Sequence, residues 1–123
     1  MISHVDRTLF EIADMMALAR TGCYVEFDLF GIETSYYTLS EIDLPNDAIR
    51  VDRVADLLSA GHGARVLISQ DICNKSRLTS YGGEGYGHLL TRVVPLMRRK
   101  GFTEADTGLT MKRNPSEVLA IQR

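Results

Sequence analysis

The sequence predicts an α/β protein with a parallel sheet, and two features of the 123-residue chain carry this prediction. Short runs rich in β-branched and aromatic residues alternate three times with longer stretches whose apolar residues recur at helical spacing. A helical stretch between successive strands is the usual crossover that makes neighbouring strands parallel. The length fits a single domain, which we assign to residues 1–123.

The first unit begins almost at the first residue, where residues 2–4 have the character of a strand end. Thr8 and Glu11 have the spacing of a capping box, in which each side chain satisfies a free backbone N–H at a helix start. The helix that follows is expected to bury one face and to end at Gly22. The apolar residues of that face are Leu9, Ile12, Ala13 and Met16.

The second unit starts with a strand at residues 23–28 (CYVEFD). Residues 29–45 then form a loop that is long for a compact domain, which hints at a functional role. A helix is predicted to begin at Asn46 or Asp47 and to end at Gly61. Its buried face is expected to contain Val51, Val54, Ala55 and Leu58.

The third unit starts with a strand at residues 65–71 (RVLISQD), and the glycine-rich loop at residues 81–88 leads into a third helix. Pro95 lacks a backbone N–H and is expected to kink this helix or to mark its real start. Thr103 and Asn114-Pro115 are expected to begin two short closing helices. The buried face of the third helix is predicted to contain Leu90, Val93, Val94 and Met97.

Three parallel strands are too few for a finished architecture, because they neither close into a barrel nor form a sheet covered on both faces. We therefore expect the chain to be part of a larger sheet, with unpaired strand edges and exposed apolar surface. Such edges pair readily with another chain, so we expect self-association or a homodimer.

The composition is that of an ordinary soluble globular protein, with 45% hydrophobic residues and a formal net charge of -2. This balance predicts neither nucleic acid nor a membrane surface as a partner, and no apolar run reaches the roughly 18 residues of a membrane span. Cys23 and Cys73 are expected at opposite ends of the sheet, too far apart for a disulfide, which fits a reducing cytoplasm.

Three polar residues follow the predicted strands: His4, Asp28 and Asp71. The carboxyl ends of parallel strands meet at one edge, where α/β proteins place their chemistry. His4 and Asp71 are separated by one strand, so their backbones are expected roughly 10 Å apart and their side chains could share a Zn²⁺ or similar ion. Alternatively, His4 caps the helix entry and Asp71 accepts backbone N–H bonds, since two ligands alone do not make a site.

Other catalytic motifs are weaker. The loop GGEGYG starts ten residues after the strand and lacks the Lys-Ser/Thr of a phosphate-binding loop, so a flexible rim loop packed by Tyr81 and Tyr86 is the better interpretation. No GxSxG elbow supports a serine hydrolase, and Ser69 lies inside a strand. Cys73 could be a nucleophile, but a lone cysteine is more often a small buried packing residue.

Several segments taken together resemble the phosphotriesterase family of the amidohydrolase superfamily, with the phosphotriesterase-related branch nearest. They are ISHVDRT, GCYVEFDLFGIE, LISQDICNKSRLTSYGGEGYGHLL, VVPLMRRKG and NPSEVL, and they cover essentially the whole chain. The resemblance implies a metal-dependent-hydrolase (β/α)8 TIM barrel, of which this chain would be the C-terminal portion, from strand six to strand eight with the closing helices.

The resemblance also implies a pair of divalent metal ions, usually zinc. His4 matches the ligand on strand six and Asp71 the ligand on strand eight, where Asp71 would also be catalytic by orienting or deprotonating a metal-activated hydroxide. That hydroxide would attack a lactone, carboxyl ester, amide or phosphoester. The other family ligands belong to strands absent from this chain, so we expect the chain alone to bind zinc weakly or not at all and to be inactive. The alternative is a non-catalytic truncated scaffold or a small-ligand-binding protein.

Two loops would shape the pocket for a small-molecule substrate. Leu29 stands where organophosphate-cleaving members have a His, and Arg7 where they have an acid, which favours a lactone, another carboxyl ester or an amide. Glu84 stands where many relatives have a His. The pocket residues implied by the resemblance are Asp28, Leu29, Phe30, Cys73, Arg77, Tyr81, Glu84 and Tyr86.

Overall fold

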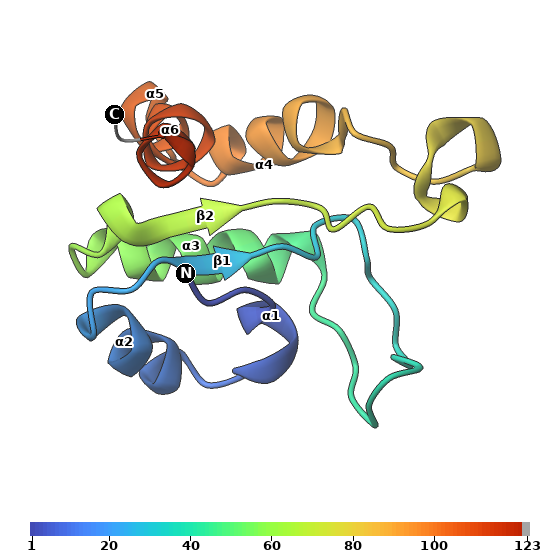
Figure 1. Ribbon diagram of the computed structural model, residues 1–123, viewed down its shortest axis with the longest axis horizontal. Coiled ribbons are helices and arrows are strands. Elements are labelled where there is room, and N and C mark those ends of the chain that lie inside the picture. Colours follow the sequence, from blue (N-terminus) through green and yellow to red (C-terminus); the bar gives the residue numbers. More distant parts are fainter. Residues whose placement is uncertain (122–123) are drawn as a thin grey trace.

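The computed structural model describes residues 1–121 and contains a small parallel sheet. Strands β1 (Val25–Phe27) and β2 (Val66–Ile68) pair in parallel, with Val25 opposite Val66. Ile2 forms a parallel bridge to Val25 on the other side of β1. The three predicted strand regions therefore lie side by side in the expected order, with β1 in the middle (Figure 1).

The first helical region differs from the prediction. It is divided into α1 (Val5–Thr8) and α2 (Ile12–Arg20), with an extended residue, Leu9, after α1. The predicted capping box is wrong, because Thr8 belongs to α1 and its hydroxyl donates to the carbonyl oxygen of His4 at 2.8 Å. Glu11 precedes α2 without a side-chain cap.

The later start of α2 changes its buried face. Met15 and Ala19 are buried, Ala13 is exposed, and three of the predicted residues are only partly buried against the core: Leu9, Ile12 and Met16. Gly22 has a φ of 81°, the left-handed conformation expected just after the helix.

Helix α3 (Asp47–Ser59) begins where the sequence predicts, after a long loop without helix or strand at residues 29–45. The Asn46 side chain accepts the backbone N–H of Ile49 at 3.0 Å, which satisfies one of the free donors of the first turn. Gly61, with a φ of 85°, lies two residues beyond the helix. The most deeply buried apolar residues of α3 are Val51, Val54 and Leu57, and the predicted Ala55 and Leu58 are partly buried.

The chain after β2 forms short 3-10 turns at Lys75–Arg77 and Thr79–Tyr81, and then two interrupted helices. A π-helical turn at Leu89–Val93 leads into α4 (Val94–Arg99), and Pro95 lies in the first turn of α4. Pro95 thus lies at the start of the regular α-helix α4, but the prediction that it marks the real start of the helical segment is wrong, because helical backbone already begins at His88. The extra residue of the π turn buries Leu89 and leaves Leu90 66% exposed, which corrects the predicted face.

The closing region repeats this arrangement. Helix α5 (Glu104–Gly108) continues through a π-helical turn at Leu109–Arg113 into α6 (Asn114–Leu119), which carries a proline in its first turn. A proline cannot donate to the carbonyl four residues back, and its ring clashes with that group, so a wider turn before it removes the conflict.

One apolar core holds these elements together. It is centred on β1 and β2, whose Val25, Phe27 and Val66 are fully buried. Helix α3 lies behind the two strands in Figure 1, α2 lies on the β1 side, and α5 and α6 lie on the β2 side. Cys23 and Cys73 are both free, as predicted, although Cys73 is exposed rather than packed inside. Among residues 1–121, no helix combines the length and apolar character that crossing a bilayer requires.

Candidate active site

The strand ends place His4, Asp28 and Asp71 along one edge of the sheet, because each follows one of three parallel segments. His4 and Asp71 have positive φ values of 60° and 47°, and within residues 1–121 they are the two non-glycine residues in this conformation. Such backbone strain costs about 1–3 kcal/mol per residue and is concentrated at functional sites in proteins. The two residues predicted as metal ligands are thus the two strained ones.

His4 makes two hydrogen bonds to the neighbouring strand end. Its Nδ1 lies 2.9 Å from Oδ1 and 2.8 Å from Oδ2 of Asp28, and its backbone N–H donates to Asp28 Oδ1 at 3.1 Å. His4 is also the N-cap residue of α1, the alternative role predicted for it, although its side chain makes no capping hydrogen bond. A carboxylate on Nδ1 leaves Nε2 free, and this is the usual arrangement behind a metal-binding histidine.

Asp28 is therefore a support for His4 rather than a wall of a pocket, since it is only 5% exposed. Burial raises the pKa of Asp28 to about 6, and the hydrogen bond from His4 opposes this rise. The charges of Asp6 and Glu26 add to the increase in pKa. A cation bound to His4 would favour the ionised form of the Asp28 carboxylate and would lower the pKa of Asp28.

Directly before these strand ends, a polar cluster crosses all three strand segments. Glu26 accepts the hydroxyl of Ser3 at 2.6 Å and that of Ser69 at 3.3 Å. These side chains lie on the face of the sheet opposite Val25 and Phe27, which point into the core. The sheet face away from the helices is thus polar next to the site.

The metal-ligand set is incomplete. Asp71 is exposed, and within residues 1–121 no group of three or more His, Cys, Asp or Glu side chains has a geometry that could hold a metal ion. An imidazole nitrogen and a carboxylate fit zinc chemically, but stable zinc sites use three or four protein ligands. His4 and Asp71 alone are therefore too few for such a site.

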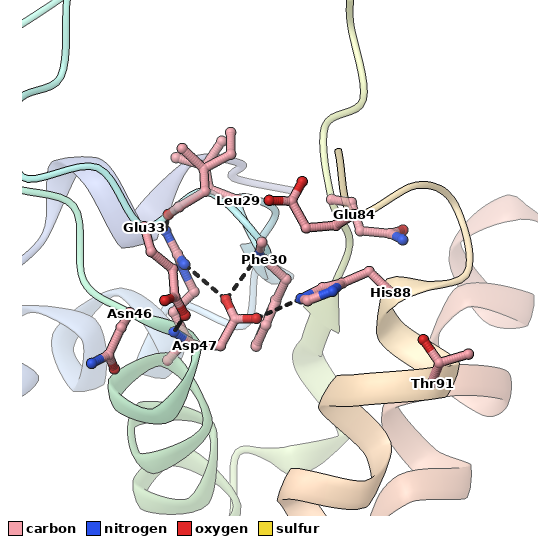
Figure 2. Close-up of polar contacts among 12 residues, drawn as sticks. Leu29, Phe30, Glu33, Asn46, Asp47, Glu84, His88 and Thr91 are labelled. Carbon is pink, nitrogen blue, oxygen red and sulfur yellow. Dashed lines mark hydrogen bonds and ion pairs between the residues drawn. The ribbon is translucent and has the colours of Figure 1, made fainter. Parts of the chain in front are cut away.

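The loop after β1 is held by a buried ionic cluster that we did not predict from the sequence. Figure 2 shows one member of this cluster, Asp47, with its polar contacts. Arg50 is 1% exposed and donates from Nε to Asp6 Oδ2 at 2.8 Å and from Nη1 to Asp47 Oδ1 at 3.0 Å. Its Nη2 donates to the carbonyl oxygen of Ile32 at 2.8 Å. Burial raises the pKa of Asp6, while the guanidinium of Arg50 acts in the opposite direction.

The same two carboxylates accept backbone N–H groups of the loop. Leu29 N–H donates to Asp6 Oδ2 at 3.1 Å, and Gly31 N–H donates to Asp47 Oδ1 at 2.9 Å. Leu29 and Phe30, which the resemblance assigns to the pocket, are 1% and 0% exposed, so their side chains lie in the interior of this chain. Asp47 and Arg50 share one helix face at i, i+3 spacing, which is the only sequence signal that could have indicated the cluster.

The rim loop after β2 divides the remaining predicted pocket residues into two groups. Arg77 Nε and Glu84 Oε2 form an ion pair at 3.2 Å, and both side chains line a cavity of about 490 Å³ with Gly31 and His88. The other group is exposed: Cys73, Tyr81 and Tyr86. The prediction that the two tyrosines pack this loop is wrong, because they are 60% and 72% exposed.

Arg7 occupies the place where the resemblance predicts a departure from the family pattern. Its Nη1 donates to the hydroxyl of Tyr37 at 3.0 Å, and its guanidinium lies over the ring of Tyr37 with the carbon 5.5 Å from the ring centre. This residue thus joins α1 to the long loop before α3.

Comparison with known proteins identifies relatives of the whole arrangement. The model of the phosphotriesterase family matches residues 1–119. The N-acetyltaurine hydrolase of Dictyostelium discoideum is 40% identical over 121 residues, which are 98% of this chain and 33% of the relative. The chain therefore spans about a third of the length of the curated relatives that it matches.

Solved structures give the same result. The crystal structure of a resiniferatoxin-binding protein from Rhodobacter sphaeroides matches with a TM-score of 0.87 and 30% identity, over 94% of this chain and 32% of that one. The phosphotriesterase homology protein from Escherichia coli, solved with phosphate in its active site, matches with a TM-score of 0.79 and 33% identity, over 94% and 36%. These neighbours are amidohydrolase TIM barrels, so the chain has the fold of part of such a barrel.

Proposed function

The chain belongs to the phosphotriesterase family, and from this membership we propose that it carries one side of the metal centre of a hydrolase. His4 and Asp71 are the proposed metal ligands, and Asp28 is the residue that orients His4. The observation that supports this assignment most is the coincidence of three properties in His4: its place at a strand end, its positive φ, and its Nδ1 contact with a buried carboxylate. A histidine with no ligand to bind has little need for all three.

A divalent metal ion, zinc by family resemblance, would lower the pKa of a water molecule and polarise the scissile bond. In this proposal Asp28 keeps the proton of His4 on Nδ1, so that Nε2 stays a ligand. The proposed catalytic role of Asp71 is to accept a proton from the attacking water. Its exposed position on the rim, next to the loop that leads to Cys73, makes it accessible to a substrate.

The proposed substrate is a small molecule with a carboxyl-derived bond, and we favour an amide. Several of the most similar curated relatives are named N-acetyltaurine hydrolases, and the bond that this name specifies is an amide. Arg7, bonded to Tyr37 where organophosphate-cleaving members are expected to have an acid, argues against efficient phosphotriester cleavage. Lactones, carboxyl esters and phosphoesters remain competing substrates that the same assay can rank.

The second candidate is a non-catalytic scaffold or small-ligand-binding protein. It is supported by the incomplete ligand set, since no three metal-binding side chains gather within residues 1–121. The two candidates differ in what happens when the rest of a barrel is supplied, because only a hydrolase part would restore turnover.

The test joins this chain to the part of the Dictyostelium relative that it does not match, and measures hydrolysis of N-acetyltaurine, a lactone and a phosphotriester with zinc. We expect hydrolysis of the amide, and a fall of about 100-fold or more in Asp71→Asn, because a lost metal ligand removes several kcal/mol of transition-state stabilisation. Asp52→Asn is the matched control, since Asp52 forms an exposed ion pair with Lys100. Turnover that survives Asp71→Asn, or no turnover in a folded and zinc-loaded chimera, contradicts the proposal.

A further inference from the structure

Two rim loops meet at a single glycine. Gly31, in the loop after β1, has a φ of 89°, and a Cβ added there would lie 3.1 Å from Cγ of Glu84 and 3.3 Å from Cδ2 of His88. Glu84 belongs to the loop after β2, and His88 precedes the helical segment that follows that loop. The backbone conformation thus favours a glycine, and an added Cβ would require Glu84 and His88 to shift by a few tenths of an ångström.

One carboxylate joins these loops. Asp47 Oδ2 lies 2.6 Å from Nε2 of His88, and Asp47 Oδ1 accepts the N–H of Gly31 at 2.9 Å (Figure 2). The side chains of Asp47 and His88 are only 10% and 11% exposed. A short contact to a buried carboxylate is a strong interaction, because little water competes for either group.

The other partners of Asp47 come from α3 itself and from the loop after β1. Arg50 is on the same helix at i+3, and the backbone N–H of Asp47 donates to Glu33 Oε1 at 2.7 Å. Among residues 1–121, His88 is therefore the one hydrogen-bond partner of Asp47 that comes from beyond β2. A second link between the loops is weaker: Arg77 Nη2 donates to the carbonyl oxygen of Phe30 at 3.2 Å.

We propose that His88 and Asp47 are positioning residues that hold the two rim loops at a fixed separation and thereby set the width of the substrate pocket. The inference rests on the proposed function, because it takes the space between these loops as the pocket entrance. The hydrogen bonds of the two side chains reach Gly31 and Arg50, and not the proposed metal ligands His4 and Asp71. Substrate affinity, rather than the chemical step, is therefore the quantity that they control.

The first experiment measures amide hydrogen exchange by mass spectrometry on this chain. In His88→Ala, segments 29–33 and 77–85 should exchange about 10-fold faster, since a lost hydrogen bond to a charged group raises local opening by at least that factor. His88→Gln keeps an N–H donor and should restore most of the protection. His62→Ala removes another half-buried imidazole, beside the turn at Gly63–Arg65, and should leave both segments unchanged.

The outcomes of this experiment decide the inference without any enzyme assay. Unchanged exchange in both segments would overturn it, because the loops would then be held by other contacts. Equally faster exchange across the whole chain, α6 included, would also overturn it, since His88 would then support the fold as a whole and not the loops.

The second experiment uses the completed barrel with amide substrates that carry short and long acyl groups. His88→Ala should raise KM about 10-fold while kcat stays within about twofold, and His88→Gln should lie close to the unsubstituted protein. A fall in kcat with a changed pH profile would overturn the positioning role in favour of a chemical one. If the unsubstituted chimera hydrolyses nothing, the proposed function fails, and the exchange experiment still decides whether the loops are held by this pair.

Discussion

At the scale of single residues, backbone conformation marks the site. His4 turns the chain from the strand segment at Ile2 into α1, and its left-handed conformation directs the imidazole back toward Asp28. Asp71 has the same kind of conformation after β2. Histidine and aspartate are among the few residues other than glycine that adopt this conformation with any frequency, so both positions combine the turn with a side chain that suits the proposed role of metal ligand.

Gly31 gives a residue-scale prediction. Gly31→Ala should lower the free energy of unfolding by more than Gly82→Ala, which we expect to cost about 1 kcal/mol from the positive φ alone. Both glycines have nearly the same φ, 89° and 88°, but Gly82 has no atom within 4 Å of an added Cβ, whereas Gly31 faces Glu84 and His88. Urea unfolding of the two variants measures the difference, and equal losses would show that the loops separate at no cost.

At the scale of the elements, capping explains where prediction from the sequence worked and where it did not. The box at Thr103 forms, with Asp106 N–H donating to Thr103 Oγ1 at 3.1 Å and Thr103 N–H donating to Asp106 Oδ2 at 2.9 Å. The spacing of Thr8 and Glu11 is the same, but the chain separates them into two helices. A capping motif therefore predicts a helix start only when both of its residues belong to the start of the same helix, and tertiary packing decides whether they do.

The Thr103 cap has a pH dependence that can be measured. Hydrogen bonds from the Thr103 hydroxyl and backbone lower the pKa of Asp106, so the carboxylate stabilises α5 above the ordinary pKa near 3.8, and this stability is lost as the pH falls through the lower folded value. Thr103→Ala should cost about 1 kcal/mol at pH 7. The loss should shrink as the pH falls through the lowered pKa of Asp106, because the protonated carboxyl no longer favours the cap.

Urea unfolding at several pH values tests this, with Ser59→Ala, an exposed serine at the end of α3, as the control. A loss from Thr103→Ala that stays constant between pH 7 and pH 2 would contradict the role assigned to the Asp106 carboxylate.

At the scale of the whole molecule, residues 1–121 contain two short strands and a parallel bridge at Ile2, and the chain spans about a third of the length of its curated relatives. Ile2 lies at one edge of the sheet and β2 at the other, and neither has a further strand beside it within residues 1–121. In a TIM barrel every strand has two neighbours. The free edges are therefore the surfaces where the rest of such a barrel would pair.

Self-association is the first prediction at this scale. Gel filtration of the purified chain should show species larger than the 13.7 kDa monomer, with a proportion that rises with concentration. Ile2→Lys places a charge on the 46% exposed edge residue and should shift the distribution toward monomer. A sharp monomer peak across the micromolar range would contradict the prediction.

Weak metal binding is the second prediction at the scale of the whole molecule. Calorimetric titration of this chain with zinc should give a Kd weaker than about 10 μM, which is about −7 kcal/mol, because the two proposed ligands, His4 and Asp71, are fewer than the three or four that a stable zinc site uses. Any residual heat should disappear in His4→Ala, while His62→Ala, away from the site, should leave it unchanged. Tight binding by the unsubstituted chain would mean that further ligands are supplied, for example by a second copy.

Much of the fold follows from local chemistry that the sequence displays. The start of α3 at Asn46 and the cap at Thr103 each depend on residues within about four positions, so spacing alone predicts them. The parallel order of the strand segments follows from their alternation with helices. The two π turns could not be read in this way. The sequence consequently predicts Leu90 as buried where the structure buries Leu89, although the predicted Val93 and Met97 are buried.

The sequence by itself determined the βα order and the placing of His4, Asp28 and Asp71 at strand ends, because both follow from periodicity. Only the tertiary structure decided that Asp28 contacts His4, 24 residues away, and that Arg50 binds Asp6, 44 residues away, as well as Asp47. The physical reason is burial. An ionised side chain taken out of water must find its partners wherever the packed chain brings them, and no spacing along the sequence specifies that place.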